Sequence, residues 1–290
     1  MLRSIKNLAV IVIFLLIAWP APGNQSDVEL PSIGKAISAD GVEIVYTKQG
    51  KGEPTVIFIH GGFADRSYWS NQMNPFSKKY QVIALDLAGH GESGKNRKKW
   101  DLPSFAQDVR AVMEKEKIHR AILVGNSLGG PVAIETAWLL PTKVIGIVPV
   151  DTYQDFTARP PTGYYQKIAA SFRTDFNKTM QQLIRSLFHE NVDPTLLKQI
   201  DGKMLKNSAE IAASLMESLE TYDMISTIKK VPQPIRCING DLYPTQIEKN
   251  QGIHPDFDAV IIPQCGHFPM LEQPESFNRK LAQILINLEK

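Results

Sequence analysis

The sequence is poor in cysteine: among its 290 residues only Cys237 and Cys265 carry a thiol. So low a count excludes a disulfide-dense scaffold, and the separation of the two cysteines does not match a zinc site. A disulfide between them stays open, because an exported protein can form one. Both also fall on candidate strands, where a small buried side chain fits equally well.

The sequence also lacks a strong charge bias. Its 32 basic and 30 acidic residues give a net charge of +2, which is too small to predict binding to nucleic acid or to an anionic membrane surface. The densest basic run, residues 95–99, lies between Gly94 and Pro103 and is expected to be a solvated loop. Internal repeats and low-complexity tracts are absent as well.

No apolar run reaches the ~20 residues that a membrane-spanning helix needs. The longest, Leu8 to Ala18, follows Arg3 and Lys6 and ends at the helix-breaking residues 19–23. A charged start, a short apolar stretch and a small-residue end are typical of an export signal. Residues 1–25 are therefore predicted to be a signal peptide or, alternatively, an uncleaved anchor. The protein is expected to be exported to the periplasm or secreted, or held at the membrane by this segment alone.

The remaining sequence, with 43% hydrophobic and 21% charged residues overall, is typical of a globular protein with a real core. After a linker over residues 26–34, apolar runs alternate with helical periodicity up to residue 151. The predicted strands are 37–38, 42–47, 55–59, 81–85, 121–124, 144–150, 235–239 and 260–263. Alternating strands and helices predict an α/β fold with a mostly parallel sheet. Continuous apolar strands indicate that helices cover both faces.

The alternation stops between residues 152 and 232, where the sequence is helical and amphipathic. A segment of this length is too long for a loop and is predicted to be an inserted helical cap. Three parts follow: a first core segment at 26–151, the cap at 152–232, and a second core segment at 233–290.

The most informative residues are Gly125-Asn126-Ser127-Leu128-Gly129-Gly130, between an apolar strand and a helical run. A G-x-S-x-G sequence in this setting is the nucleophile elbow, which raises a serine hydroxyl on a tight turn. Glycine at positions 125 and 129 avoids collisions of side chains with the neighbouring strand and helix. Ser127 is therefore the candidate nucleophile.

A serine hydroxyl needs an imidazole to take its proton. His267 follows the last predicted strand, and loops at the carboxyl ends of parallel strands meet at one edge of the sheet. His60 and His90 also end strands there and are interpreted as loop residues.

For the acid that orients the base, the chain order Ser, Asp/Glu, His favours Asp241. Asp151 is the alternative acid, and Asp155 is a weaker third.

Two backbone N–H groups should hold the oxyanion. One belongs to Leu128, directly after the nucleophile at a helix N-terminus. The other is expected from Gly62 or Phe63, in the loop after the first central strand.

Four sequence segments together resemble the α/β-hydrolase superfamily over residues 30–290: His60-Gly61-Gly62, residues 86–93, the Ser127 elbow, and Gly266-His267 with residues 272–277. The resemblance implies Ser127 as nucleophile and His267 as base. One departure concerns the acid: the superfamily usually places it about three residues after the strand-ending glycine, whereas Asp241 directly follows Gly240.

These residues predict a serine hydrolase that acts on a small or medium carboxylic ester, with no metal and no organic cofactor. Asn126 before the nucleophile is similar to the elbow of hydrolases that cleave C–C bonds in ring-fission products, so that reaction stays an alternative, as does a lactone or amide substrate. A binding protein that keeps the pocket and turns over little is the alternative from another class. The oligomeric state has no signal in the sequence.

Overall fold

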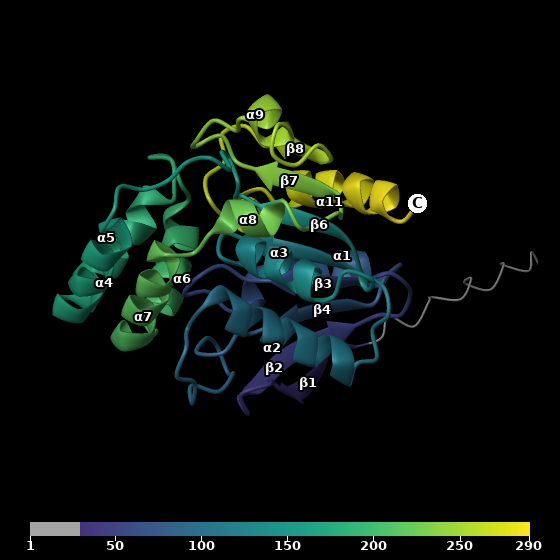
Figure 1. Ribbon diagram of the computed structural model, residues 1–290, viewed down its shortest axis with the longest axis horizontal. Coiled ribbons are helices and arrows are strands. Elements are labelled where there is room, and N and C mark those ends of the chain that lie inside the picture. The colour runs from purple at the N-terminus through teal and green to yellow at the C-terminus, as the bar shows by residue number, and fades with distance from the viewer. Residues whose placement is uncertain (1–29) are drawn as a thin grey trace, which may run out of the picture.

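The computed structural model describes residues 30–290. The export segment predicted at residues 1–25 lies outside the described residues. The described part forms an eight-stranded sheet in the order β1-β2-β4-β3-β5-β6-β7-β8 (Figure 1). The strands are β1 (Ser32–Ile37), β2 (Glu43–Gln49), β3 (Thr55–Ile59), β4 (Val82–Leu85), β5 (Ala121–Asn126), β6 (Val144–Val150), β7 (Ile235–Asn239) and β8 (Phe257–Ile261).

The pairs β1–β2 and β2–β4 are antiparallel, and all other neighbouring strands run parallel. Strands β3, β4 and β5 are buried along their whole length, as their continuous apolar sequence predicts. The edges deviate more from the sequence pattern. Strand β1 begins inside the expected linker, because an edge strand that exposes Ile33 and Ile37 carries no strong apolar signal.

Helices cover both faces of the sheet. Figure 1 shows α2, α3 and α8 in front of it and α1 and α11 behind it. The helical elements of the core are η1 (Arg66–Trp69), α1 (Ser70–Ser77), α2 (Leu102–Lys115), α3 (Gly129–Leu139), α9 (Ile247–Gln251), α10 (Pro269–Glu272) and α11 (Pro274–Leu288). Trp69 and Phe277 are fully buried between the sheet and the helices behind it.

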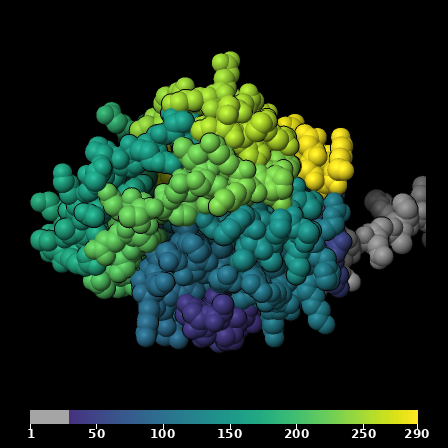
Figure 2. Space-filling model, viewed as in Figure 1, coloured from purple at the N-terminus to yellow at the C-terminus, as the bar shows by residue number. Residues whose placement is uncertain are grey.

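The segment between β6 and β7 contains helices and no strand. They are α4 (Tyr164–Thr174), α5 (Phe176–Ser186), α6 (Pro194–Met204), α7 (Ala209–Glu220) and α8 (Met224–Ile228). Helices α4 to α7 form a lobe beside the sheet, at the left of Figures 1 and 2. The lobe contacts the loop after β3: the rings of Phe172 and Phe63 lie 5.5 Å apart, and the Asn207 amide donates to the Phe63 carbonyl at 2.8 Å.

The basic run at residues 95–99, which was expected to be a solvated loop, is buried at Arg97. Arg97 is buried, with its side chain only 1% exposed, and it forms ion pairs with Asp108 at 2.5 Å and with Asp40 at 2.7 Å. The pattern of the run could not reveal this, because both partners lie elsewhere in the sequence.

Cys237 and Cys265 are both free and buried, so no disulfide joins them.

Candidate active site

Ser127 stands on a strained turn between β5 and α3, with a φ of 50° that only glycine adopts easily. A Cβ atom at Gly125 would lie 2.1 Å from the Gly129 carbonyl oxygen, and one at Gly129 would lie 2.4 Å from the Ile59 carbonyl oxygen. Both glycines are therefore required for the turn to pack between β3 and α3. The Ser127 N–H donates to the Val150 carbonyl at 3.0 Å, which fixes the turn to the end of β6.

His267 lies in the loop between β8 and α10, and its Nδ1 is 2.6 Å from Oδ2 of Asp151. The Asp151 side chain is only 3% exposed, and its Oδ1 accepts hydrogen bonds from the Gly240 N–H at 3.0 Å and the Gln154 amide at 3.1 Å. A carboxylate on Nδ1 selects the tautomer that leaves Nε2 unprotonated. The His267 ring is thus set up to accept a proton at Nε2.

The expected contact between Asp241 and His267 is not formed, and Asp151 takes that place. The carboxylate of Asp241 instead accepts from the N–H groups of Gln264 at 2.8 Å and Cys265 at 3.1 Å. The physical reason is the short loop after β7. Gly240, directly after β7, packs closely against the loop that carries His267, since a Cβ atom at Gly240 would lie 2.2 Å from the Cys265 carbonyl oxygen. The carboxylate of Asp241, the next residue, therefore contacts the backbone of Gln264 and Cys265 and does not reach the His267 ring.

Asn126 joins the nucleophile turn to the His267 loop. Its Nδ2 donates to the Val150 carbonyl at 3.1 Å and to the His267 carbonyl at 3.0 Å. Ser127 and His267 are both partly exposed at this edge of the sheet. Among the described residues the Ser127 hydroxyl makes no hydrogen bond, and catalytic hydrogen bonds often tighten only when substrate binds. Sequence reasoning noticed Asn126 without predicting this linking role.

The oxyanion donors predicted from sequence lie beside the elbow. Leu128 precedes the first turn of α3, and a Cβ atom at Gly62 would lie 3.9 Å from its Cβ. Phe63 has a φ of 65°, so the chain turns sharply there. Within residues 30–290, none of the three N–H groups donates to a protein acceptor. All three are available for a developing oxyanion at this edge.

Two buried histidines fix the loops around these donors. The His60 Nε2 accepts from the Leu87 N–H at 2.9 Å, and its Nδ1 donates to the Gly61 carbonyl at 2.7 Å. Burial lowers the pKa of His60 to about 4 and the pKa of His90 to about 3. Both rings are therefore neutral at pH 7, and their centroids lie 5.0 Å apart. They brace the loops after β3 and β4, as interpreted from the sequence.

Two phenylalanines of the inserted segment serve as packing. Phe172 is fully buried and packs edge-on against Phe63 and at a tilt against Phe176. Phe156 is also fully buried, between Tyr153 and Phe257. Leu215 of α7 also lies close to one of the donors, with its Cδ2 3.8 Å from the position that a Cβ atom would take at Gly62.

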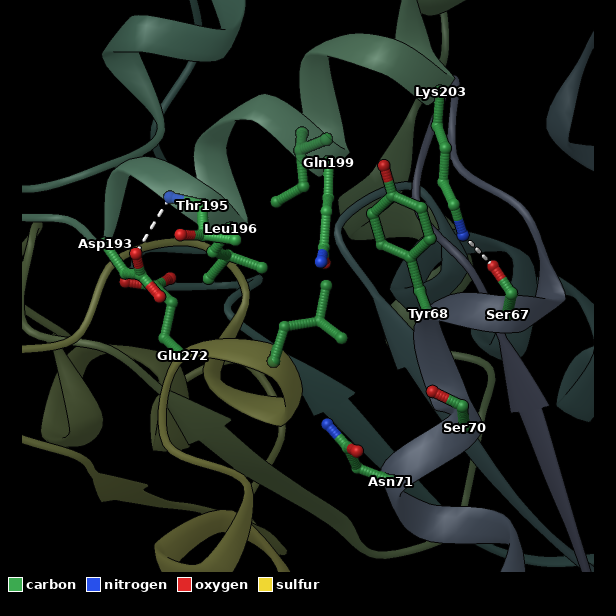
Figure 3. A pocket seen from close by; sticks show the side chains of 12 residues that line it. Ser67, Tyr68, Ser70, Asn71, Asp193, Thr195, Leu196, Gln199, Lys203 and Glu272 are labelled. Atoms are coloured by element: carbon green, nitrogen blue, oxygen red, sulfur yellow. Dashed lines mark hydrogen bonds between the residues drawn. The ribbon is translucent and has the colours of Figure 1, made fainter.

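A cavity of about 380 Å³ lies between the core and α6 (Figure 3). Gln199 and Lys203 extend toward it from α6 and Tyr68 from η1, and the Lys203 ammonium donates to the Ser67 hydroxyl. The Tyr68 hydroxyl has no hydrogen-bond partner among the described residues. Tyr68 packs edge-on against Phe268, the residue after His267. Neither Ser127 nor His267 lines this space. Its lining residues are Ser67, Tyr68, Ser70, Asn71, Asp193, Thr195, Leu196, Gln199, Ile200, Lys203, Leu271 and Glu272.

Within residues 30–290, no group of three or more His, Cys, Asp or Glu side chains is arranged to hold a metal ion. None of the helices in this range combines the length and apolar character needed to cross a bilayer.

Comparisons with known proteins show the family and the fold. A model of the alpha/beta hydrolase family matches residues 56–280. The chain is 28% identical over 280 residues to the 2-hydroxy-6-oxo-6-(2'-aminophenyl)hexa-2,4-dienoic acid hydrolase of Metapseudomonas resinovorans, covering 84% of this chain and 88% of that protein. It is 25% identical over 252 residues to the pimeloyl-acyl-carrier-protein methyl ester esterase of Klebsiella pneumoniae, covering 82% and 96%.

Two further similarities concern length and fold. The chain spans only 64% of the dihydrolipoyllysine-residue acetyltransferase component of the acetoin cleaving system of Pseudomonas putida, at 24% identity over 245 residues and 81% of this chain. The solved structure of a thermophilic esterase from Thermogutta terrifontis superposes with a TM-score of 0.78 at 22% identity, covering 89% of this chain and 100% of that one. The α/β fold predicted from the sequence is confirmed.

Proposed function

The chain belongs to the alpha/beta hydrolase family, and from that premise we propose that it is a serine hydrolase that cleaves small or medium carboxylic esters through an acyl-enzyme. One observation carries the proposal: the 2.6 Å contact between Asp151 and Nδ1 of His267, at the sheet edge where the strained Ser127 stands. Nucleophile, base and acid then follow the roles of a serine-based triad, with Asp151 as the acid.

In the first half-reaction the Ser127 oxygen attacks the ester carbonyl while Nε2 of His267 takes its proton. The Leu128 N–H and an N–H of Gly62 or Phe63 stabilise the oxyanion, and removing one such donor typically costs about 10²–10³ in kcat. The intermediate then collapses, the C–O bond to the alcohol breaks, and His267 returns the proton to the departing alcohol. The Asp151 side chain holds Nδ1 of His267 and stabilises the imidazolium.

In the second half-reaction water attacks the acyl group, again with His267 as base, and Ser127 leaves with the proton. The proposed reaction requires neither metal nor cofactor. We also propose that residues 152–232 form a cap that lines the substrate pocket, since Leu215 and Phe172 reach the loop after β3. The Klebsiella relative is named as an ester hydrolase, which supports the choice of substrate class.

A second candidate is the hydrolysis of a C–C bond. Asn126 before the nucleophile and the similarity to the Metapseudomonas hydrolase favour it. In this structure, however, both Asn126 amide hydrogens are directed at backbone carbonyls, so the residue has a structural use that does not depend on the bond cleaved. Lactone and amide substrates would use the same residues in the same roles.

The test is labelling with a fluorophosphonate probe, followed by mass spectrometry of the labelled peptide. We expect a single label on Ser127, no label in Ser127→Ala, and steady release of p-nitrophenol from p-nitrophenyl acetate and butyrate. Ser67→Ala, which changes an exposed serine on η1, is the matched control. A label elsewhere on folded protein rejects the mechanism, and a stoichiometric burst without turnover favours a binding protein instead.

A further inference from the structure

Every backbone N–H group from residue 264 to 268, in the loop that carries His267, donates to a protein oxygen. The acceptors are the carboxylates of Asp241 and Glu272 and the carbonyl of Leu187. A connecting loop usually leaves much of its backbone to solvent. Here every N–H group of residues 264–268 has a protein acceptor, so the position of the His267 ring depends on the residues that supply those acceptors.

Asp241 holds the first half of the loop. Its two carboxylate oxygens accept from the N–H groups of Gln264 at 2.8 Å and Cys265 at 3.1 Å. These bonds lower the pKa of Asp241 below its ordinary value, with the Gln264 N–H as the largest cause. The carboxylate is therefore ionised at neutral pH, and hydrogen bonds to a charged acceptor are roughly twice as strong as neutral ones.

Glu272 holds the second half from α10. Its Oε2 accepts from the Gly266 N–H and its Oε1 from the Phe268 N–H, both at 2.9 Å. The carboxylate thus bridges the two residues on either side of His267. A side chain at Gly266 would not fit here, since its Cβ would lie 2.6 Å from the Leu187 carbonyl oxygen and 3.1 Å from both Glu272 oxygens. Glu272 also borders the cavity beside α6 (Figure 3).

The inserted segment supplies the fifth acceptor. The His267 N–H donates to the carbonyl of Leu187, at the end of α5, at 2.9 Å. Two residues further on, His189 places Nε2 2.9 Å from Oδ1 of Asp241. The Leu187–His189 turn therefore contacts the His267 loop in two ways: directly at the His267 N–H, and indirectly through Asp241.

We propose that Asp241 and Glu272 are positioning residues that hold the His267 loop so that the ring meets Asp151 and Ser127, with the Leu187–His189 turn tying this loop to the inserted segment. The inference rests on the proposed serine-hydrolase function. It also gives Asp241 a role different from that of the catalytic acid. A displacement of about 1 Å in a reacting group can cost about 10²-fold in rate, so loosening this loop should act on kcat.

The experiment compares Asp241→Asn, Glu272→Gln and Asp151→Asn on p-nitrophenyl butyrate from pH 5 to 9, with Glu275→Gln as an exposed carboxylate control. For Asp241→Asn and Glu272→Gln we expect kcat to fall about 10- to 100-fold. Their KM should stay within about twofold, and the acidic limb of the pH profile should stay in place, because the Asp151–His267 pair survives. Asp151→Asn should lower kcat by about 10⁴ and move that limb to lower pH.

The possible failures are distinct. If wild-type protein neither turns over ester nor labels at Ser127, the proposed function and this inference both fall. If wild type is active and Asp241→Asn and Glu272→Gln match Glu275→Gln, only the positioning role is rejected. If Asp241→Asn shifts the acidic limb as Asp151→Asn should, Asp241 is the acid.

If Asp241→Asn or Glu272→Gln does not fold, His189→Ala takes its place. This variant changes a partly exposed side chain and leaves the carboxylates of Asp241 and Glu272 in place. We expect kcat to fall a few-fold at unchanged KM, with faster hydrogen exchange at the amides of residues 264–268. Wild-type exchange and wild-type kcat in this variant would reject the link between the inserted segment and the loop.

Discussion

The side-chain amide of Asn126 donates a 3.0 Å hydrogen bond to the backbone carbonyl of His267, 141 positions further along the chain. The same nitrogen donates to the Val150 carbonyl, directly before Asp151. One buried amide thus joins the residue before the proposed nucleophile, the backbone of the proposed base and the residue before the proposed acid. The relative placement of the three groups depends on this contact as well as on the sheet.

We predict that Asn126→Ala lowers kcat about 10-fold with a smaller effect on KM, because the His267 loop loses its link to the elbow. It should also lower the free energy of unfolding by about 1–3 kcal/mol, since the hydrogen bonds of the amide to the Val150 and His267 carbonyls are lost. Steady-state kinetics and urea unfolding measure the two effects. Wild-type kcat in a variant that is destabilised as expected would show that the contact serves stability alone.

A second prediction concerns the elbow glycines. Gly129→Ala would place a Cβ atom 2.4 Å from the Ile59 carbonyl oxygen, a backbone atom that cannot rotate away. Overpacking of this kind costs about 1–3 kcal/mol or more, and the shift it forces should reduce fluorophosphonate labelling of Ser127. Gly202→Ala, in a helix where nothing lies within 4 Å of the new atom, is the control. Equal labelling rates in the two variants would contradict the steric requirement.

The third prediction addresses the buried ion pair. Asp108 accepts from Arg97 at 2.5 and 3.0 Å and from the Ser38 hydroxyl at 2.7 Å. Asp108→Asn leaves the Arg97 charge buried with Asp40 as its remaining partner, and breaking such a pair typically costs about 3–5 kcal/mol. Glu114→Gln, which removes the exposed partner of Arg110 on the same helix, should change stability by less than about 0.5 kcal/mol. Urea unfolding of both variants tests the contrast.

The sequence predicted what depends on local pattern. Continuous apolar runs identified the central strands, and a strand–turn–helix pattern with two glycines identified Ser127. The position of His267 followed from the rule that parallel strands end at one edge. Edge strands were predicted less well: β8 was expected at 260–263 and lies at 257–261, because partial exposure interrupts its apolar run.

The choice between the two acids could not come from local pattern. Asp151 and Asp241 follow neighbouring strands, and which one reaches the ring depends on how closely Gly240 packs against the His267 loop. That distance is a tertiary property. The same holds for His189, which has no motif around it and gains its contact with Asp241 only when the inserted segment folds over the sheet edge.

The last prediction concerns stability and pH. Burial lowers the pKa of His60 to about 4 and of His90 to about 3, against about 6.5 in an unfolded chain. The folded protein therefore binds fewer protons than the unfolded chain. The stability that these rings contribute is fully present above pH 6.5 and is lost as pH falls toward 4.

Below pH 6.5 each histidine should remove up to about 1.4 kcal/mol per pH unit from the free energy of unfolding. Urea unfolding at pH 7.5, 6.0 and 5.0 measures this slope in a window where most carboxylates stay ionised. His60→Gln should flatten the slope, because glutamine carries no titrating group, whereas the exposed His119→Gln should leave it unchanged. A free energy of unfolding that is constant from pH 7.5 to 5.0 in wild-type protein would mean that these rings are not held neutral, and that the Leu87–His60 hydrogen bond does not fix the loop beside the oxyanion donors.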